Sequence, residues 1–142
     1  MSESEIDFEL VTSARSLGAA PKLRRERVIL PEVKTKSGKA AAFLCWELDA
    51  LEYGEFQDSS RVYKDGEHVG NSAKNEDLRF LAFTLRDGNG NRLWSNLEDA
   101  KSQLGKYGKS VTSKLMVASN KANFGDRDEP SAEKNSEATP AD

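Results

Sequence analysis

Apolar residues recur at regular intervals along most of the chain, and their spacing predicts the elements one after another. The first stripe, about one helical turn apart, consists of Ile6, Leu10, Ala14 and Leu17. It predicts a short amphipathic helix over residues 4–17, with Ser4 and Asp7 as a capping pair. Because the residue before a proline is pushed out of the α region, we expect residues 17–21 to form a linker.

Two apolar runs on either side of the turn "KTKSGK" predict a β-hairpin over residues 27–48. The second run, "AAAFLCWEL", places Ala42, Leu44, Trp46 and Leu48 on one strand face. Since alanine and leucine favour helix, a helix over residues 40–48 is the alternative. The tetrapeptide "DALE" then predicts a helix that starts at Ala50, with Asp49 as N-cap and Glu52 completing a capping box. This helix would carry Leu51, Tyr53 and Phe56.

Residues 57–76 form a long polar interval. Its centre, "YKDGEHV", holds an Asp-Gly pair that suits a type I′ hairpin turn. A small edge hairpin and a mobile loop both fit this composition. We expect the mobile loop, because the interval contains few apolar residues to anchor it.

A helix that is apolar on nearly every side is predicted next, with Asn75 or Asp77 as its cap. Such a helix is typical of the centre of a core. Its apolar residues are Leu78, Phe80, Leu81, Phe83 and Leu85.

After the turn "DGNGN" and a short segment over residues 92–94, the clearest periodicity of the chain begins. Apolar residues about 3.6 apart predict one helix of six turns, starting at a capping box of Ser95 and Glu98. Met116 and Val117 lie off the stripe, so we expect the end of this helix to offer a second apolar face to another subunit. The stripe consists of Leu97, Ala100, Leu104, Tyr107, Val111, Leu115 and Ala118.

The last segment, residues 125–142, contains no large apolar residue and has an excess of acids. It cannot bury enough surface to offset the entropy of ordering, so we expect a disordered acidic tail. The predicted organisation is an N-terminal segment over residues 1–22, one globular domain over residues 23–124, and this tail. The predicted fold class is α+β, a small helix-dominated domain with a short N-terminal β-hairpin.

Composition narrows the function classes. The 142 residues suffice for one core, and the net charge of −3 is spread over mixed signs, so no overall field favours nucleic acid or a membrane. No apolar run approaches the roughly 20 residues that span a bilayer. The acidic start "MSESEIDFEL" is unlike a secretory signal, so we expect a cytosolic protein.

Catalytic chemistry has few candidate residues here. Cys45 is the only cysteine and His68 the only histidine, and His68 lies in a polar stretch with no apolar framework to fix an imidazole. We therefore expect no enzymatic activity, no cofactor and no cysteine-rich metal site.

The stretch from Asp87 to Glu98 raises the alternative of a calcium-binding module. Oxygen-bearing side chains fall at the EF-hand ligand positions, but the sixth position, which requires glycine for a sharp turn, is Arg92. The capping box also gives Glu98 another role. We therefore expect a turn and no metal ion. The candidate ligands are Asp87, Asn89, Asn91, Ser95 and Glu98.

The second alternative is a small nucleic-acid-binding protein, based on the basic cluster between Lys22 and Arg27. Recognition of single strands normally interleaves aromatic residues for base stacking, and none lies between Lys22 and Val33. A charged strand edge is the favoured interpretation. The cluster consists of Lys22, Arg24, Arg25 and Arg27.

Two further features have ordinary explanations. "GKS" at residues 108–110 matches the end of a phosphate-binding loop, but the glycine required five places earlier is Gln103. Gly105 and Gly108 are expected to let the long helix pack closely against a neighbour. Trp46 and Trp94 are expected in the core, where large aromatic residues usually lie.

The order of segments says more than any motif. The run "RVILPEVKTKSGKAAAFLCWELDALEYGEF", the polar interval and "LRFLAFTLRDGNGNRLWSNLEDAKSQLGKYGKSVTSKLMVASNKANF" resemble the tail assembly chaperones of long-tailed (siphovirus-type) bacteriophages. The resemblance covers residues 27–124. The residues that carry it are Leu48, Glu52, Asp87, Gly90, Trp94, Glu98, Asp99 and Asn123.

The resemblance implies a binding protein and not an enzyme. Such a chaperone coats the tape measure protein, keeps its apolar helices soluble, recruits tail tube subunits and leaves before the virion matures. It would work in the host cytoplasm and form homo-oligomers, as a ring or an open spiral. No membrane or nucleic-acid partner is implied.

Overall fold

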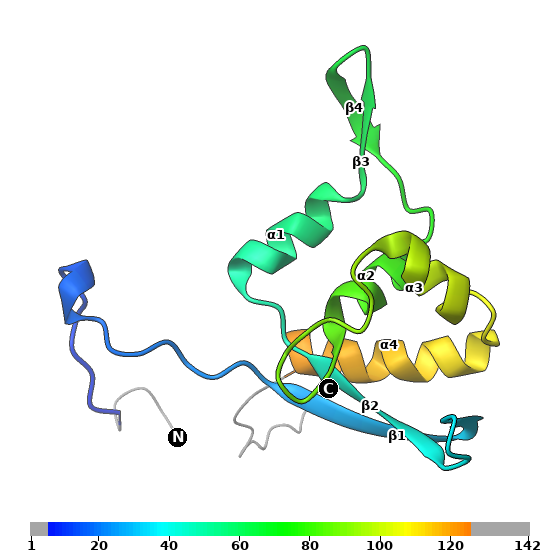
Figure 1. The fold of residues 1–142 in the computed structure, drawn as a ribbon. Helices are drawn as coiled ribbons and strands as arrows, with labels where there is room; N and C mark the ends of the chain where they lie inside the picture. The colour runs from blue at the N-terminus through cyan, green and yellow to red at the C-terminus, as the bar shows by residue number, and fades with distance from the viewer. Residues whose placement is uncertain (1–5, 126–142) are drawn as a thin grey trace, which may run out of the picture.

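The structure is a computed structural model that describes residues 6–125. It has an α+β fold in which a sheet lies under a group of helices, and a second, small hairpin stands away from the body (Figure 1). The strands are β1 (Arg25–Lys34), β2 (Ala40–Trp46), β3 (Arg61–Lys64), β4 (Glu67–Asn71) and β5 (Leu85–Arg86). The helices are α1 (Ala50–Asp58), α2 (Glu76–Thr84), α3 (Leu97–Leu104) and α4 (Lys109–Phe124).

The predicted N-terminal hairpin is confirmed. β1 and β2 pair antiparallel, from Arg25 opposite Trp46 to Leu30 opposite Ala41, so residues 40–46 are strand and the helical alternative is wrong. The register shifts after Leu30, around Pro31, whose missing N–H makes a bulge on an edge strand its natural place.

The face of β2 that packs on the core is not the predicted face of Ala42, Leu44 and Trp46. Ala41 and Cys45 are buried and Phe43 packs against the core, whereas Ala42 is exposed and Trp46 is half-buried on the other face. Both faces of this strand carry apolar residues, so alternation alone does not distinguish them.

The core lies between the sheet and helices α2, α3 and α4. α4 crosses β1 and β2, while α2 contacts α3, α4 and β2. The prediction that α2 is a buried helix is confirmed, although Leu85 follows it as part of β5. The buried core cluster consists of Leu30, Cys45, Leu81, Ala82, Leu85, Ala100, Leu104, Val111 and Leu115.

Local sequence signals predicted one capping box and one turn correctly. The Asp49 side chain accepts from the Glu52 N–H at 2.8 Å and the Glu52 carboxylate accepts from the Asp49 N–H at 3.3 Å, which is the predicted capping box. Asp65 and Gly66 have φ of 53° and 81°, as a type I′ turn requires. That turn joins β3 to β4, so the expected mobile loop is in fact a hairpin.

The predicted N-terminal helix is wrong. Within the described part of residues 4–17, only Ala14–Ser16 forms a single 3-10 turn, and the chain before it is exposed and has no regular secondary structure. A short isolated helix is marginal in water and gains most of its stability from packing, and these residues pack against nothing buried. The predicted acidic tail, apart from Gly125, lies outside the described residues.

The predicted six-turn helix is also wrong, because it is two helices. α3 ends at Gly105, where an added Cβ would lie 2.5 Å from the Lys101 carbonyl oxygen, and α4 begins after its N-cap Gly108. These glycines therefore separate two helices and are not a close-packing surface. The N-cap of α3 is Asn96, whose side chain accepts from the Asp99 N–H at 2.8 Å, and not Ser95.

Asn123, near the end of α4, connects that helix to the chain leaving β2. Its Oδ1 accepts from the Leu48 N–H at 2.8 Å, and its Nδ2 donates to the Trp46 carbonyl at 3.1 Å and to the Ser119 carbonyl at 2.9 Å. One side chain thus satisfies two backbone groups between the end of β2 and the start of α1, and a third within its own helix.

We expect Asn123→Ala to lower the free energy of unfolding by about 1–3 kcal/mol, because it leaves the Leu48 N–H and the Trp46 carbonyl without their partner. Asn120→Ala, at an exposed position of the same helix, should change it by less than about 0.5 kcal/mol. Urea denaturation followed by circular dichroism measures both. Equal effects of the two variants would contradict the role given to Asn123.

Candidate protein-binding site

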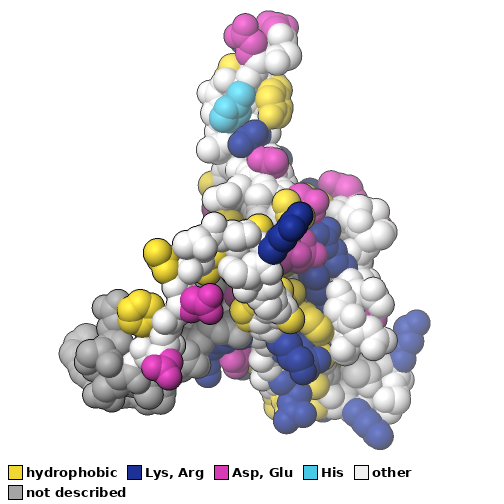
Figure 2. Space-filling view, turned by 90° about the vertical axis from the view of Figure 1, so that its left-hand side faces the viewer, with side chains coloured by type: hydrophobic (Ala, Val, Ile, Leu, Met, Phe, Trp, Pro, Cys, Tyr) yellow, Lys and Arg dark blue, Asp and Glu magenta, His cyan; other side chains and the backbone are white. Residues whose placement is uncertain are grey.

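The hairpin formed by β3 and β4 projects from the body and has no buried residue (Figure 1). Val62, Tyr63 and Val69 are 41%, 57% and 58% exposed, so the hairpin presents apolar side chains to solvent. Figure 2 shows apolar groups along it and acidic groups at its tip. A two-stranded hairpin is marginally stable alone, so these side chains suit a partner that packs on them.

Arg79 of α2 holds the base of this hairpin. Its side chain is buried, Nη1 donates to the Lys74 carbonyl, and Nη2 donates to the Ser72 carbonyl at 3.0 Å. The Ser72 N–H in turn donates to the Ser60 carbonyl at 2.7 Å. A guanidinium that bonds two carbonyls of the returning chain fixes where the hairpin leaves the body.

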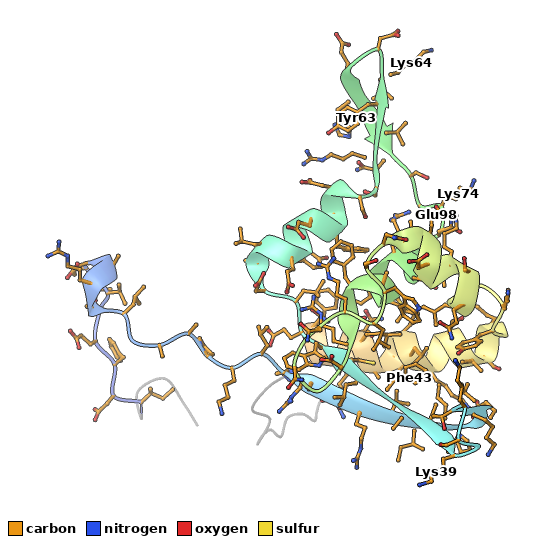
Figure 3. All side chains as sticks on the ribbon, viewed as in Figure 1. Lys39, Phe43, Tyr63, Lys64, Lys74 and Glu98 are labelled. Carbon is orange, nitrogen blue, oxygen red and sulfur yellow. The ribbon has the colours of Figure 1, made fainter. Side chains whose placement is uncertain are left out.

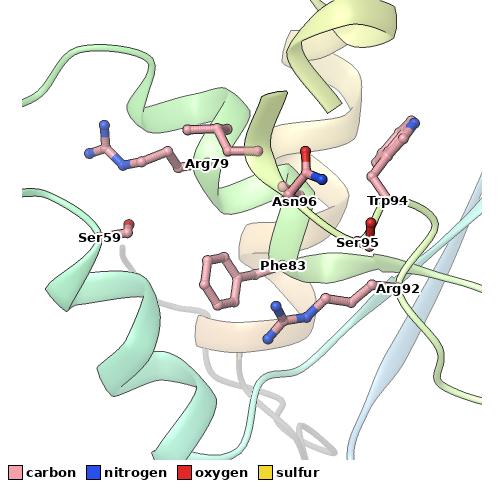
Figure 4. A pocket seen from close by; sticks show the side chains of 9 residues that line it. Ser59, Arg79, Phe83, Arg92, Trp94, Ser95 and Asn96 are labelled. Carbon is pink, nitrogen blue, oxygen red and sulfur yellow. The ribbon is translucent and has the colours of Figure 1, made fainter. Parts of the chain in front are cut away.

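A cavity of about 250 Å³ lies beside this anchor, between the end of α1, α2 and the segment that leads into α3 (Figure 4). Its lining combines apolar surface with two guanidinium groups. An apolar side chain flanked by a carboxylate would match both properties. The lining residues are Ser59, Arg79, Ala82, Phe83, Arg92, Trp94, Ser95, Asn96 and Leu97.

Arg92 is held in place on three sides. Its guanidinium lies 4.2 Å from the centre of the Phe83 ring, 3.5 Å from a Glu55 oxygen and 3.9 Å from a Glu52 oxygen. Glu52 is also 2.9 Å from the buried guanidinium of Arg86. These ion pairs connect α1 to Arg86 of β5 and to Arg92. They therefore fix the side of the cavity formed by α1 to the side formed by the segment after β5.

Aromatic contacts form the remaining seam between α1 and the body. Phe56 of α1 packs against Phe80 and Phe83 at 5.0 and 5.9 Å between ring centres, and Tyr53 packs against Phe124 at 5.9 Å. No residue of α1 is fully buried. Rings and ion pairs therefore attach α1 to the body, while the hydrogen bonds of Arg79 hold the base of its hairpin.

Sequence reasoning missed this site because its residues come from separate elements. Arg79 was a signal that could have been used, since it lies within an otherwise apolar helix predicted to be buried.

Trp94 lines the cavity, half-buried, and its Nε1 donates to Gln103 at 3.0 Å. Trp46 is also half-buried, with the Arg25 guanidinium 5.0 Å from its ring centre, so neither tryptophan lies fully inside the core as predicted.

The loop that follows β5 uses Asp87 as a turn residue. Its Oδ1 accepts from the N–H groups of Asn91 and Asn89 at 3.0 and 2.8 Å, and these bonds hold the pKa of the carboxyl below its ordinary value of 3.8. Glu98 lies in α3, 3.7 Å from Lys101, and does not cap that helix. Within residues 6–125, no group of three or more acidic, histidine or cysteine residues is placed to hold a metal ion.

The basic residues before and within β1 have separate local roles. Arg24 Nη1 donates to the Gly125 carbonyl at 2.6 Å and its Nη2 lies 3.8 Å from Glu26, while Arg25 lies over Trp46. Arg27 is exposed on β1. A continuous basic surface for nucleic acid would need these side chains to point the same way, which the contacts of Arg24 and Arg25 do not favour.

His68 lies exposed on β4, with its Nε2 3.2 Å from the Asn71 side-chain oxygen and its ring beside Tyr63. The "GKS" residues form the N-cap and first turn of α4, where Lys109 pairs with Asp77 at 3.0 Å. Within the described part of the chain, no helix is long and apolar enough to span a bilayer.

Comparison with known protein families, with curated proteins and with solved structures finds no match.

We expect calcium to leave the melting temperature unchanged at millimolar concentration. Asp87 is already bonded to backbone N–H groups, and the position that requires glycine is Arg92, which carries a positive charge. Calorimetric titration and thermal melting test this. A dissociation constant below about 10⁻⁴ M would contradict it.

We expect Arg79→Leu to loosen the hairpin without unfolding the core. The amides of β3 and β4 should exchange with deuterium faster, while those of α4 keep their protection, because only the bonds to Ser72 and Lys74 are lost. Lys74→Ala is the matched control, since it keeps the backbone acceptor. Unchanged exchange in Arg79→Leu would show that the hairpin is held by other contacts.

Proposed function

We propose that this protein is a tail assembly chaperone of a long-tailed bacteriophage, a binding protein and not an enzyme. In this role it coats the tape measure protein, recruits tail tube subunits and leaves before the virion is complete, all in the host cytoplasm. The segment order over residues 27–124 supports this proposal through the resemblance described above.

The observation that carries the proposal is the apolar surface on elements that stand clear of the body. The β3–β4 hairpin exposes Val62, Tyr63 and Val69, and the cavity at its base combines Phe83 with the guanidinium of Arg92. A tape measure protein is long, helical and apolar along one face. Apolar anchors with adjacent charges suit binding of such amphipathic helices.

Coating a long partner also requires many identical sites in succession. Head-to-tail contacts between copies produce a ring or an open spiral, whereas a two-fold contact stops at a dimer. Each contact with the partner can be weak, because repetition along one chain supplies avidity. The proposed chaperone therefore self-associates.

Coexpression with the tape measure protein from the same genome tests the proposal. That protein should be insoluble alone and should co-purify in solution with many copies of this one. If it stays insoluble and this protein remains a monomer at high concentration, the proposal is wrong.

A pair of variants locates the binding surface. Val69→Thr on the hairpin should lower the amount of soluble complex at least about fourfold, since one buried methyl group contributes roughly 0.8 kcal/mol. Ile29→Thr on the outer face of β1 is the control, because the two residues are similarly exposed at 58% and 55% and both lie in strands. Equal losses would place the binding surface elsewhere.

A further inference from the structure

Within residues 6–125, part of the central strand of the main sheet, β2, lacks a neighbour on one side. On the side away from β1, β2 pairs with β5 only at Leu44 and Cys45, so residues 40–43 have no strand beside them among the described residues. In an antiparallel strand, alternate residues turn both backbone groups away from a given neighbour. Half of these residues therefore direct an N–H and a carbonyl toward the open side, which is a template for another strand.

A groove of about 490 Å³ runs along this open edge. Ala41, Ala42 and Phe43 form one wall, and Trp94 and Tyr107 belong to the other. The bond from Trp94 to Gln103 fixes that indole, so the second wall has a defined shape. The groove thus offers backbone hydrogen bonds on one side and aromatic surface on the other.

The chain also carries an exposed segment without regular secondary structure near its N-terminal end. Residues 6–10, here called the arm, alternate apolar Ile6, Phe8 and Leu10 with acidic Asp7 and Glu9. The three apolar side chains are 48%, 79% and 79% exposed. In an extended chain, residues two apart share a face, so the arm has the pattern of a strand with one apolar side.

The arm and the groove match in length, chemistry and position. Four open residues span about 13 Å and the five arm residues about 17 Å. Lys34 lines the groove, and its charge is opposite to that of Asp7 and Glu9. The arm extends from one side of the molecule, whereas Phe43 lies toward the other (Figures 1 and 3).

We propose that the arm of one copy adds as a strand to the open edge of β2 in a second copy, with its apolar side chains in the groove. Because arm and groove lie on opposite sides, each copy gives an arm to one neighbour and receives an arm from the other. Such pairing is heterologous and continues head to tail. The proposal rests on the self-association included in the proposed function, and not on the identity of any other partner.

Sedimentation velocity of the full chain tests this without another protein. The wild type should form species that grow with concentration. Phe8→Ser combined with Leu10→Ser should weaken association about tenfold to a hundredfold, because the two apolar side chains that would be buried in the neighbour's groove are removed. Leu17→Ser, which is 62% exposed but outside the arm, should associate as the wild type does.

The groove is tested from the other side. Leu93, which lines the groove and is 45% exposed, becomes acidic in Leu93→Glu and should repel the acidic arm. Leu51→Glu on α1, at an 81% exposed position, is the control and should have no effect. A wild type that stays monomeric, or arm and groove variants that associate normally, would overturn the proposal.

Chemical crosslinking shows whether the pairing joins two copies. A Phe8→Cys chain mixed with an Ala42→Cys chain should give a heterodimer with a short bifunctional thiol reagent. Native Cys45 should not compete, since it is fully buried and burial raises the pKa of its thiol. If a chain with both substitutions links only within itself, the arm folds back on its own groove and the proposal fails.

The two proposals can fail separately. A chain that assembles through its arm but does not solubilise the tape measure protein would refute the proposed function and leave strand exchange intact. A chain that solubilises that protein but associates equally well without its arm residues would refute strand exchange and leave the proposed function intact.

Discussion

The arrangement of the whole body depends on the contact between the end of α4 and the end of β2. Asn123 satisfies the Trp46 carbonyl and the Leu48 N–H, which lie where the chain passes from β2 to α1. It also bonds the Ser119 carbonyl within α4. Backbone groups at such transitions lack partners from their own element, and a buried one without a partner is costly. By supplying those partners from α4, Asn123 fixes the direction in which the chain enters α1, and hence where the projecting hairpin stands.

The elements that the sequence predicts well are those whose signal is local. The Asp49 and Glu52 capping box and the Asp65–Gly66 turn involve side chains and backbone within a few residues, so tertiary structure does not need to be known. The split between α3 and α4 could not be predicted from periodicity, because Leu104 and Val111 remain in phase across the break and are buried in one core. The two helices are separated by the short break between the C-cap Gly105 and the N-cap Gly108.

The candidate site was beyond local reasoning for a related cause. Arg79 and Arg92 are separated along the chain and line the same cavity only after α1, α2 and the loop before α3 are placed.

The wrong prediction of an N-terminal helix has a different origin. Residues 6–17 fit a helical spacing, but residues 6–10 also fit an alternating one, and no packing surface in the described structure favours the helix. The period of a short apolar pattern is decided by what it packs against.

The bulge at Pro31 gives the sheet two unlike sides. On the outer edge of β1, the proline has no N–H to give and the register is interrupted between Leu30 and Lys34, so another strand cannot pair along the whole of β1, while residues 40–43 of β2 are accessible on the other side. A filament built through the accessible edge would have a polarity, with a vacant acceptor at one terminus and an unengaged donor at the other. Its length could then be set by a factor that caps only one terminus, and addition and removal of copies would proceed at different rates at the two ends.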